Sequence, residues 1–136
     1  MKLSVENVDV KLGKKVIVKN VSLEVPKNKT IGLIGANGSG KTTLLKSIYK
    51  STAVSSGSVY LDDLDILKAS NKEVAKYLGV VGQFNDLNFD LTVKQIVILG
   101  RTPHKKLLES DSAEDYQIVH EALEKTQLLA YENRSY

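Results

Sequence analysis

A glycine-rich segment around residue 40 constrains the fold of this chain more than any other feature. Residues 35–42 read Gly-Ala-Asn-Gly-Ser-Gly-Lys-Thr, the pattern of a phosphate-binding loop. Glycines lack a Cβ, so the backbone can turn with positive φ and direct its N–H groups at oxyanions. Lys41 supplies a positive charge for the terminal phosphates of a nucleotide, and the Thr42 hydroxyl is placed to bind Mg²⁺.

The residues on either side of this loop fit the same interpretation. The apolar run 30–34 predicts a short buried parallel strand, and residues 43–49 begin a helix. Such a helix points its N-terminal dipole and free N–H groups at the phosphates. The alternative is a flexible Gly/Ser turn between two core elements. The full motif in this context favours a nucleotide site.

Composition and length indicate a soluble globular domain. The 136 residues are 42% hydrophobic and 26% charged, which is ordinary for a single soluble domain. The absence of cysteine excludes disulfides and thiolate metal sites. No apolar run approaches the roughly 20 residues of a membrane span, and the first residues lack the apolar core of a signal peptide. We therefore expect a cytoplasmic protein.

The net charge of +3 is unevenly distributed along the chain. Residues 1–108 carry a net charge of +8, whereas residues 109–136 carry −5. A basic region raises the question of nucleic acid, but its lysines are scattered and are not interleaved with aromatic residues. A solvated surface explains this distribution better, so no nucleic-acid partner is expected.

Alternating apolar residues predict an antiparallel β region before the loop. Strands are expected over residues 2–5, 8–12, 16–18 and 21–25, with a turn at 13–15 and a stop at Pro26. After the loop, strands are expected at 59–61 and 78–82. The aspartates at 62, 63 and 65 are interpreted as a solvated turn rather than a metal site.

Three further helices are predicted. The first covers residues 71–76 with Ser70 or Asn71 as its N-cap. The second covers 92–99, although its β-branched residues leave a strand as the competing assignment. The third begins after Ser112, has Asp115 three residues on, and shows apolar residues at helical spacing to about residue 129.

With these motifs in place, the chain resembles the N-terminal half of the ATP-binding subunits of ABC transporters. The resemblance extends over all 136 residues and also rests on the segments 6–8, 18–25 and 57–62. It implies an α/β fold: a P-loop NTPase core with an N-terminal antiparallel β region and the start of a helical subdomain. The core would cover residues 1–83 and the helical part residues 84–136.

The resemblance assigns roles to individual residues. Gln83, 42 residues after Lys41, matches the Q-loop of the family and would contact Mg²⁺ and the attacking water. Taken alone, the same glutamine is a solvent-exposed residue at a strand end. Leu12 stands where the family usually has an aromatic residue that stacks on adenine. It offers the base an apolar contact without stacking, so base binding is expected to be weaker or to use another residue. By the same resemblance, Lys41 and Gln83 are catalytic, and Thr42 and Gln83 bind Mg²⁺. The residues expected to hold the phosphates of ATP are Gly35, Asn37, Gly38, Ser39, Gly40, Lys41, Thr42 and Thr43.

A second segment indicates which group within the family the chain resembles. Residues 99–105 read Leu-Gly-Arg-Thr-Pro-His-Lys, similar to importers of iron–siderophore complexes, haem and cobalamin. This resemblance implies two partners, a membrane permease and a second ATP-binding subunit, and a location at the inner face of the cell membrane. His104 has no neighbouring ligand residues in the sequence and is interpreted as a surface or structural residue, and His120 is given no role.

The chain departs from the family pattern at its end. The signature motif, the Walker B strand with its carboxylates and the switch histidine would follow residue 136. Without a general base, phosphoryl transfer loses orders of magnitude in rate. We therefore expect an incomplete domain that binds nucleotide weakly, hydrolyses it negligibly and self-associates. The alternatives are an ABC-type ATPase without a membrane partner and a non-enzymatic interaction module.

Overall fold

The computed structural model describes residues 1–82 and 90–135, and the chain divides into two compact units, Met1–Val80 and Val81–Tyr136. Each unit is described by itself. The boundary expected between residues 83 and 84 lies outside the described residues.

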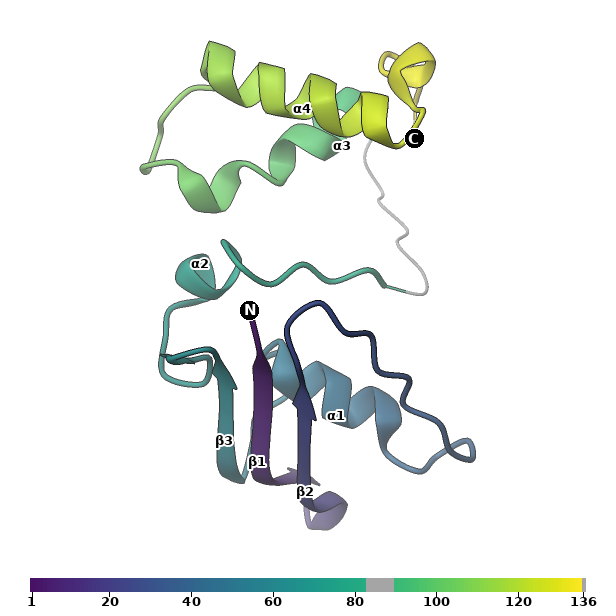
Figure 1. Ribbon diagram of the computed structural model, residues 1–136, viewed down its shortest axis with the longest axis vertical. Coiled ribbons are helices and arrows are strands. Elements are labelled where there is room, and N and C mark those ends of the chain that lie inside the picture. Colours follow the sequence, from purple (N-terminus) through teal and green to yellow (C-terminus); the bar gives the residue numbers. More distant parts are fainter. Residues whose placement is uncertain (83–89, 136) are drawn as a thin grey trace. The chain divides into compact units, whose positions relative to one another are not determined.

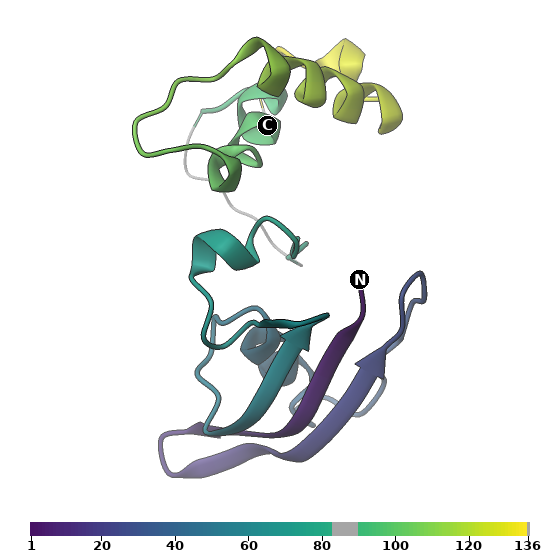
Figure 2. The same cartoon turned by 60° about the vertical axis from the view of Figure 1, so that its left-hand side comes forward.

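The first unit is built on an antiparallel sheet (Figures 1 and 2). Its order is β2-β1-β3-β4, with every pairing antiparallel. The helix α1 contacts β1 and β2. The bounds are β1 (Leu3–Leu12), β2 (Lys15–Val25), α1 (Lys41–Ile48), β3 (Ser56–Leu61), β4 (Leu64–Asp65) and α2 (Asn71–Val74).

The four short strands expected at the N-terminus form two long ones. The expected breaks coincide with irregular pairing at Asn7 and Asn20, which both have a φ of 49°. Asparagine tolerates this left-handed backbone. The Asn7 N–H donates to Ser22 Oγ (2.9 Å) and the Asn20 N–H donates to Asp9 Oδ1 (2.6 Å). The apolar alternation is therefore interrupted while the strand continues.

One continuous core holds the first unit together. It combines residues from one face of the sheet with residues from α1 and from the segment around α2. In β3, and in β1 after the irregularity at Asn7, every second residue is buried, which is the period expected for strands with one covered face. The buried apolar residues are Val5, Val8, Val10, Val18, Leu44, Ile48, Val59, Leu61, Ile66 and Val74.

The strands predicted at 30–34 and 78–82 were wrong for this structure. Neither segment belongs to a strand, and Ile34 and Val81 are 95% and 96% exposed. A strand forms only when a neighbour accepts its backbone hydrogen bonds. The described residues provide no such neighbour for either segment, so most of their apolar side chains stay in contact with solvent, while Leu78 packs partly against the core.

The turn after β3 is fixed by its aspartates. Asp62 has a φ of 51°, and its carboxylate accepts from the Lys2 N–H (2.7 Å). The Asp65 carboxylate accepts from the Leu67 and Lys68 N–H groups and pairs with the Lys68 ammonium (2.8 Å). These contacts shape the backbone. Ser70 is the N-cap of α2 and accepts from the Glu73 N–H (3.2 Å).

The second unit consists of helices. Residues 93–99 are a helix, which settles the helix-or-strand alternative; Thr92 and Gln95 form a capping box at its start. Ser112 and Asp115 form the second capping box, as expected. The elements are α3 (Val93–Leu99), η1 (Thr102–His104), α4 (Ala113–Lys125) and η2 (Leu129–Tyr131).

Helix α4 packs on α3 and ends earlier than expected. Val119 and Leu123 are its buried apolar residues. The helix stops because Gln127 adopts a left-handed φ of 59°. The Leu128 N–H then donates to the Leu123 carbonyl (2.8 Å), which closes a Schellman motif. Among the described residues, no helix is long and apolar enough to cross a membrane.

Candidate nucleotide-binding site

The glycine-rich loop lies between the unpaired segment 30–34 and α1, close to β2. Gly38 and Gly40 have φ values of 80° and 94°. A Cβ on Gly40 would lie 3.0 Å from the Ile17 carbonyl oxygen of β2. Gly40 therefore combines a left-handed backbone with close approach to a strand, which no other residue type accommodates without strain.

Lys41 folds back over the loop that precedes it. Its ammonium donates to the carbonyls of Gly35 (2.7 Å) and Ala36 (2.8 Å). The charge is thereby held at the beginning of the loop rather than extended into solvent. An anion that reaches the loop competes with two neutral carbonyls for the ammonium, and hydrogen bonds between two charged groups are stronger than those to a neutral acceptor.

The first turn of α1 offers further donors. Its N-cap, Gly40, has no side chain to cap the helix, and the first turn contains no acidic residue. The first intrahelical bond beyond the loop is from the Leu44 N–H to the Gly40 carbonyl (2.8 Å). The N–H groups of residues 41–43 therefore have no helical partner, and the dipole of α1 adds positive potential. This is the arrangement that binds phosphate.

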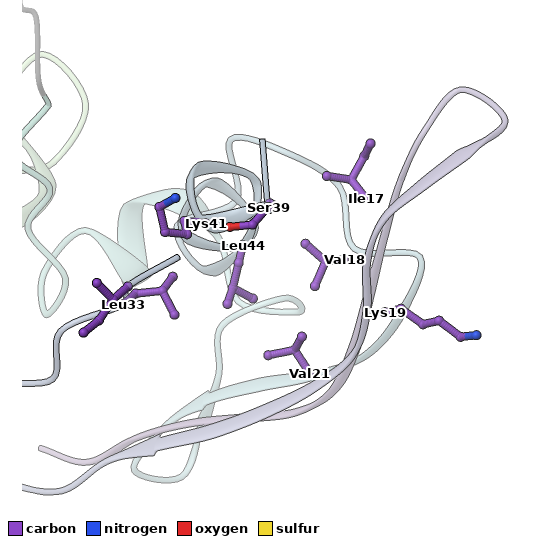
Figure 3. Close-up of a pocket in the computed structure, with 10 residues that line it drawn as sticks. Ile17, Val18, Lys19, Val21, Leu33, Ser39, Lys41 and Leu44 are labelled. Carbon is purple, nitrogen blue, oxygen red and sulfur yellow. The ribbon is translucent and has the colours of Figure 1, made fainter. Parts of the chain in front are cut away.

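A cavity of about 340 Å³ opens beside the loop (Figure 3). Val18, Val21 and Leu44 point into it from β2 and α1, and Lys19 points away. Ser39 and Lys41 supply its polar edge. Among the described residues, no carboxylate lines this cavity, so its electrostatics favour an anion. Its lining is Ile17, Val18, Lys19, Val21, Leu33, Ile34, Ser39, Gly40, Lys41 and Leu44.

The sequence-predicted residues are only partly brought together. Residues 35–43 form one loop and helix start. Leu12 is 52% exposed at the end of β1 and does not line the cavity. Gln83 lies outside the described residues, so its role stays a prediction. Ile17 and Val18 of β2 also line the cavity, although the sequence did not predict them as site residues. They lie near the glycine-rich loop because β2 packs against it.

The residues of this site could hold Mg²⁺ only together with the phosphates of a nucleotide. The described residues contain no group of three His, Cys, Asp or Glu side chains placed to hold a metal. Mg²⁺ usually keeps several waters and takes one or two protein oxygens together with substrate phosphates. The Thr42 hydroxyl, exposed in the first turn of α1, is such an oxygen.

The segment 99–105 has a structural role within the second unit. The Arg101 guanidinium donates to the Asp115 carboxylate (2.8 Å), and Lys105 pairs with both Asp111 and Asp115. Asp115 is 6% exposed. The Arg101 side chain and then the N–H and hydroxyl of Ser112 hold the pKa of Asp115 well below its usual range. His104 and His120 are exposed.

Comparison with known proteins identifies the family. A family model described as "ABC transporter" matches residues 18–136. The chain belongs to the ABC transporter family, which confirms the resemblance seen in the sequence and the α/β P-loop fold class.

Individual relatives show how much of the family fold is present. The chain is 36% identical over 132 residues to the iron(3+)-hydroxamate import ATP-binding protein FhuC of Bacillus subtilis, covering 97% of this chain and 49% of that protein. It is 34% identical over 134 residues to the hemin import ATP-binding protein HmuV of Pseudomonas fluorescens, covering 98% and 51%. The chain thus spans about half the length of these relatives.

A solved structure gives the corresponding match in three dimensions. The ADP conformation of an ATP-binding cassette from an ABC transporter superposes with a TM-score of 0.80 at 26% identity. The match covers 99% of this chain and 57% of that cassette. The described units are therefore those of an ATP-binding cassette.

Proposed function

We propose that this chain binds MgATP as the phosphate-binding half of an importer ATPase. The observation that carries the proposal is the loop of residues 35–40, which is left-handed at Gly38 and Gly40 and ends in the uncapped N-terminus of α1 with the Lys41 ammonium held beside it. The phosphates would accept from the loop N–H groups, from Lys41 and from the first turn of α1. Thr42 would hold Mg²⁺ together with the phosphates, and Gln83 would complete the site.

The names of the relatives support a proposal for the cargo and the partners. Their names describe import of iron(3+)-hydroxamate and hemin. We extend this to the present chain as import of an iron complex, haem or cobalamin, powered by ATP. The chain would act with a membrane permease and a second ATP-binding subunit at the inner face of the cell membrane.

Hydrolysis by this chain alone is expected to be slow. A general base near the γ-phosphate accelerates phosphoryl transfer to water by orders of magnitude. In the part of the chain that the structure describes, the cavity beside Lys41 is lined by apolar residues, Ser39, Gly40 and two lysines, with no carboxylate to take that role. We therefore propose nucleotide binding as the activity of the described residues and hydrolysis as a property of the assembled transporter.

The test is a calorimetric titration with MgATP, comparing the chain with Lys41→Ala and Lys46→Ala. Lys46 lies on the same helix and is exposed, so it controls for the loss of one positive charge. Hydrogen bonds to charged groups contribute about 1.5–3 kcal/mol, so Lys41→Ala should weaken binding roughly 10- to 100-fold. Lys46→Ala should bind like the parent. Equal binding by all three would overturn the proposed site.

Two alternatives give different results in related experiments. An ABC-type ATPase without a membrane partner would bind MgATP and would not co-purify with a membrane protein. A non-enzymatic interaction module would show no nucleotide-dependent thermal shift, because a ligand stabilises only a fold that binds it.

A further inference from the structure

The phosphate-binding loop contains a chemically labile pair of residues. Asn37 and Gly38 form the only Asn-Gly dipeptide in the sequence. An asparagine followed by glycine is the sequence most prone to spontaneous deamidation, because the residue after the asparagine must let its backbone nitrogen reach the asparagine side chain. Glycine has no Cβ to hinder that approach.

The structure leaves both reacting groups accessible. Asn37 and Gly38 are exposed, and a Cβ built on Gly38 would meet no atom within 4 Å. The hydrogen bond within the loop, from the Ser39 N–H to the Ala36 carbonyl (3.2 Å), involves neither residue. In the described part of the chain, neither the Gly38 N–H nor the Asn37 side-chain amide has a hydrogen-bond partner. The Lys41 ammonium, bound to the Ala36 carbonyl, places a positive charge one residue away.

We propose that Asn37 is a deamidation site that disables the phosphate-binding loop. The deprotonated backbone nitrogen of Gly38 attacks Cγ of Asn37, a C–N bond forms, and the side-chain nitrogen leaves as ammonia. Water then opens the resulting succinimide at either carbonyl and gives aspartate or isoaspartate. The reaction requires only water, and no redox change occurs.

Either product opposes phosphate binding. A carboxylate at position 37 adds a negative charge to a loop whose N–H groups face an oxyanion, and like charges at close range repel. Isoaspartate also adds a methylene to the main chain, which displaces the N–H groups on either side. This consequence rests on the proposed function, since it requires the loop to bind phosphate.

Bound nucleotide is expected to protect the site. A phosphate that accepts from the loop N–H groups holds the Gly38 nitrogen away from the Asn37 side chain. Loss of activity would then accumulate in the nucleotide-free protein and be slowed by MgATP.

The experiment incubates the full chain at mildly alkaline pH with and without MgATP and follows each asparagine by peptide mass spectrometry. Asn28 is the internal control, because it is also exposed and left-handed (φ 59°) but precedes a lysine. After removal of nucleotide, MgATP binding is measured by calorimetry. Asn37→Gln, whose longer side chain cyclises slowly, is incubated in parallel and compared with its own starting affinity, and Asn37→Asp reproduces one product.

We expect Asn37 to convert many-fold faster than Asn28 and the fraction of binding-competent protein to fall in proportion to its conversion. Asn37→Gln should keep its initial affinity, and Asn37→Asp should bind weakly from the outset. Conversion of Asn37 no faster than Asn28, or converted protein that binds as well as fresh protein, overturns the proposal. If fresh protein does not bind MgATP more tightly than the Lys41→Ala variant, the proposed function is overturned instead. Mass spectrometry still decides in that case whether Asn37 deamidates.

Discussion

At the scale of single residues, the glycines of this chain have different physical reasons for being glycine. Gly57 has a φ of 95°, and a Cβ there would lie 2.5 Å from the carbonyl oxygens of both Glu6 and Asn7. Gly13, in the β1–β2 turn, also has a positive φ, of 60°, but open space where a Cβ would be. A side chain at position 13 would therefore meet backbone strain alone, whereas one at position 57 would meet both backbone strain and steric overlap.

We predict that Gly57→Ala destabilises the first unit far more than Gly13→Ala. Left-handed strain alone costs about 1–2 kcal/mol, which is the effect expected at position 13. At position 57 the overlap with two backbone oxygens adds to that strain, for a total of about 3 kcal/mol or more. Urea denaturation of both variants measures the difference. Similar losses at the two positions would show that β1 and β3 do not approach as described.

At the scale of elements, the start of α4 is held by charge. Asp115 accepts from Arg101, and it caps the helix together with Ser112. Its pKa lies below the ordinary value of 3.8, so the folded state favours the ionised form. The stability that it contributes is fully present above that ordinary value. It is lost as the pH falls toward the lower pKa of the folded state.

We therefore expect Asp115→Asn to weaken α4 at neutral pH and to remove part of its acid sensitivity. The measurement is hydrogen exchange of the α4 amides at neutral and at acidic pH. Glu114→Gln is the matched control, since Glu114 lies in the same first turn but is exposed. If protection of α4 responds equally to the two substitutions, the ion pair with Arg101 does not stabilise the helix.

At the scale of the whole molecule, two apolar segments outside the sheet are exposed. Residues 30–34 and 78–82 have the composition of buried strands, and Ile34 and Val81 are almost fully exposed. Exposed apolar segments with unpaired backbone groups favour association with other chains.

We predict concentration-dependent self-association that Ile34→Ser and Val81→Ser reduce without lowering stability, because neither side chain is buried. Leu107→Ser is the control: Leu107 is 91% exposed but lies in the loop between η1 and α4. Sedimentation over a concentration series measures the effect. Self-association that is unchanged in the double variant, or equally reduced by Leu107→Ser, contradicts the role of these segments.

Much of this arrangement follows from local sequence. The Ser112–Asp115 and Thr92–Gln95 pairs predict helix starts because capping depends on residues three positions apart. The glycine-rich motif likewise predicts a loop whose conformation its own glycines allow. The early end of α4 was missed because Gln127 adopts a left-handed φ usually taken by glycine.

The sequence by itself determined the glycine-rich loop, the helix starts and the N-terminal β region, since each depends on interactions between near neighbours. Only the tertiary structure decided that residues 30–34 and 78–82 remain outside the sheet, because a strand requires a partner that local sequence cannot supply. It also decided the pairing of Arg101 with Asp115 and the contact of β2 with Gly40. Both join residues far apart in the chain, whose proximity depends on how the elements pack.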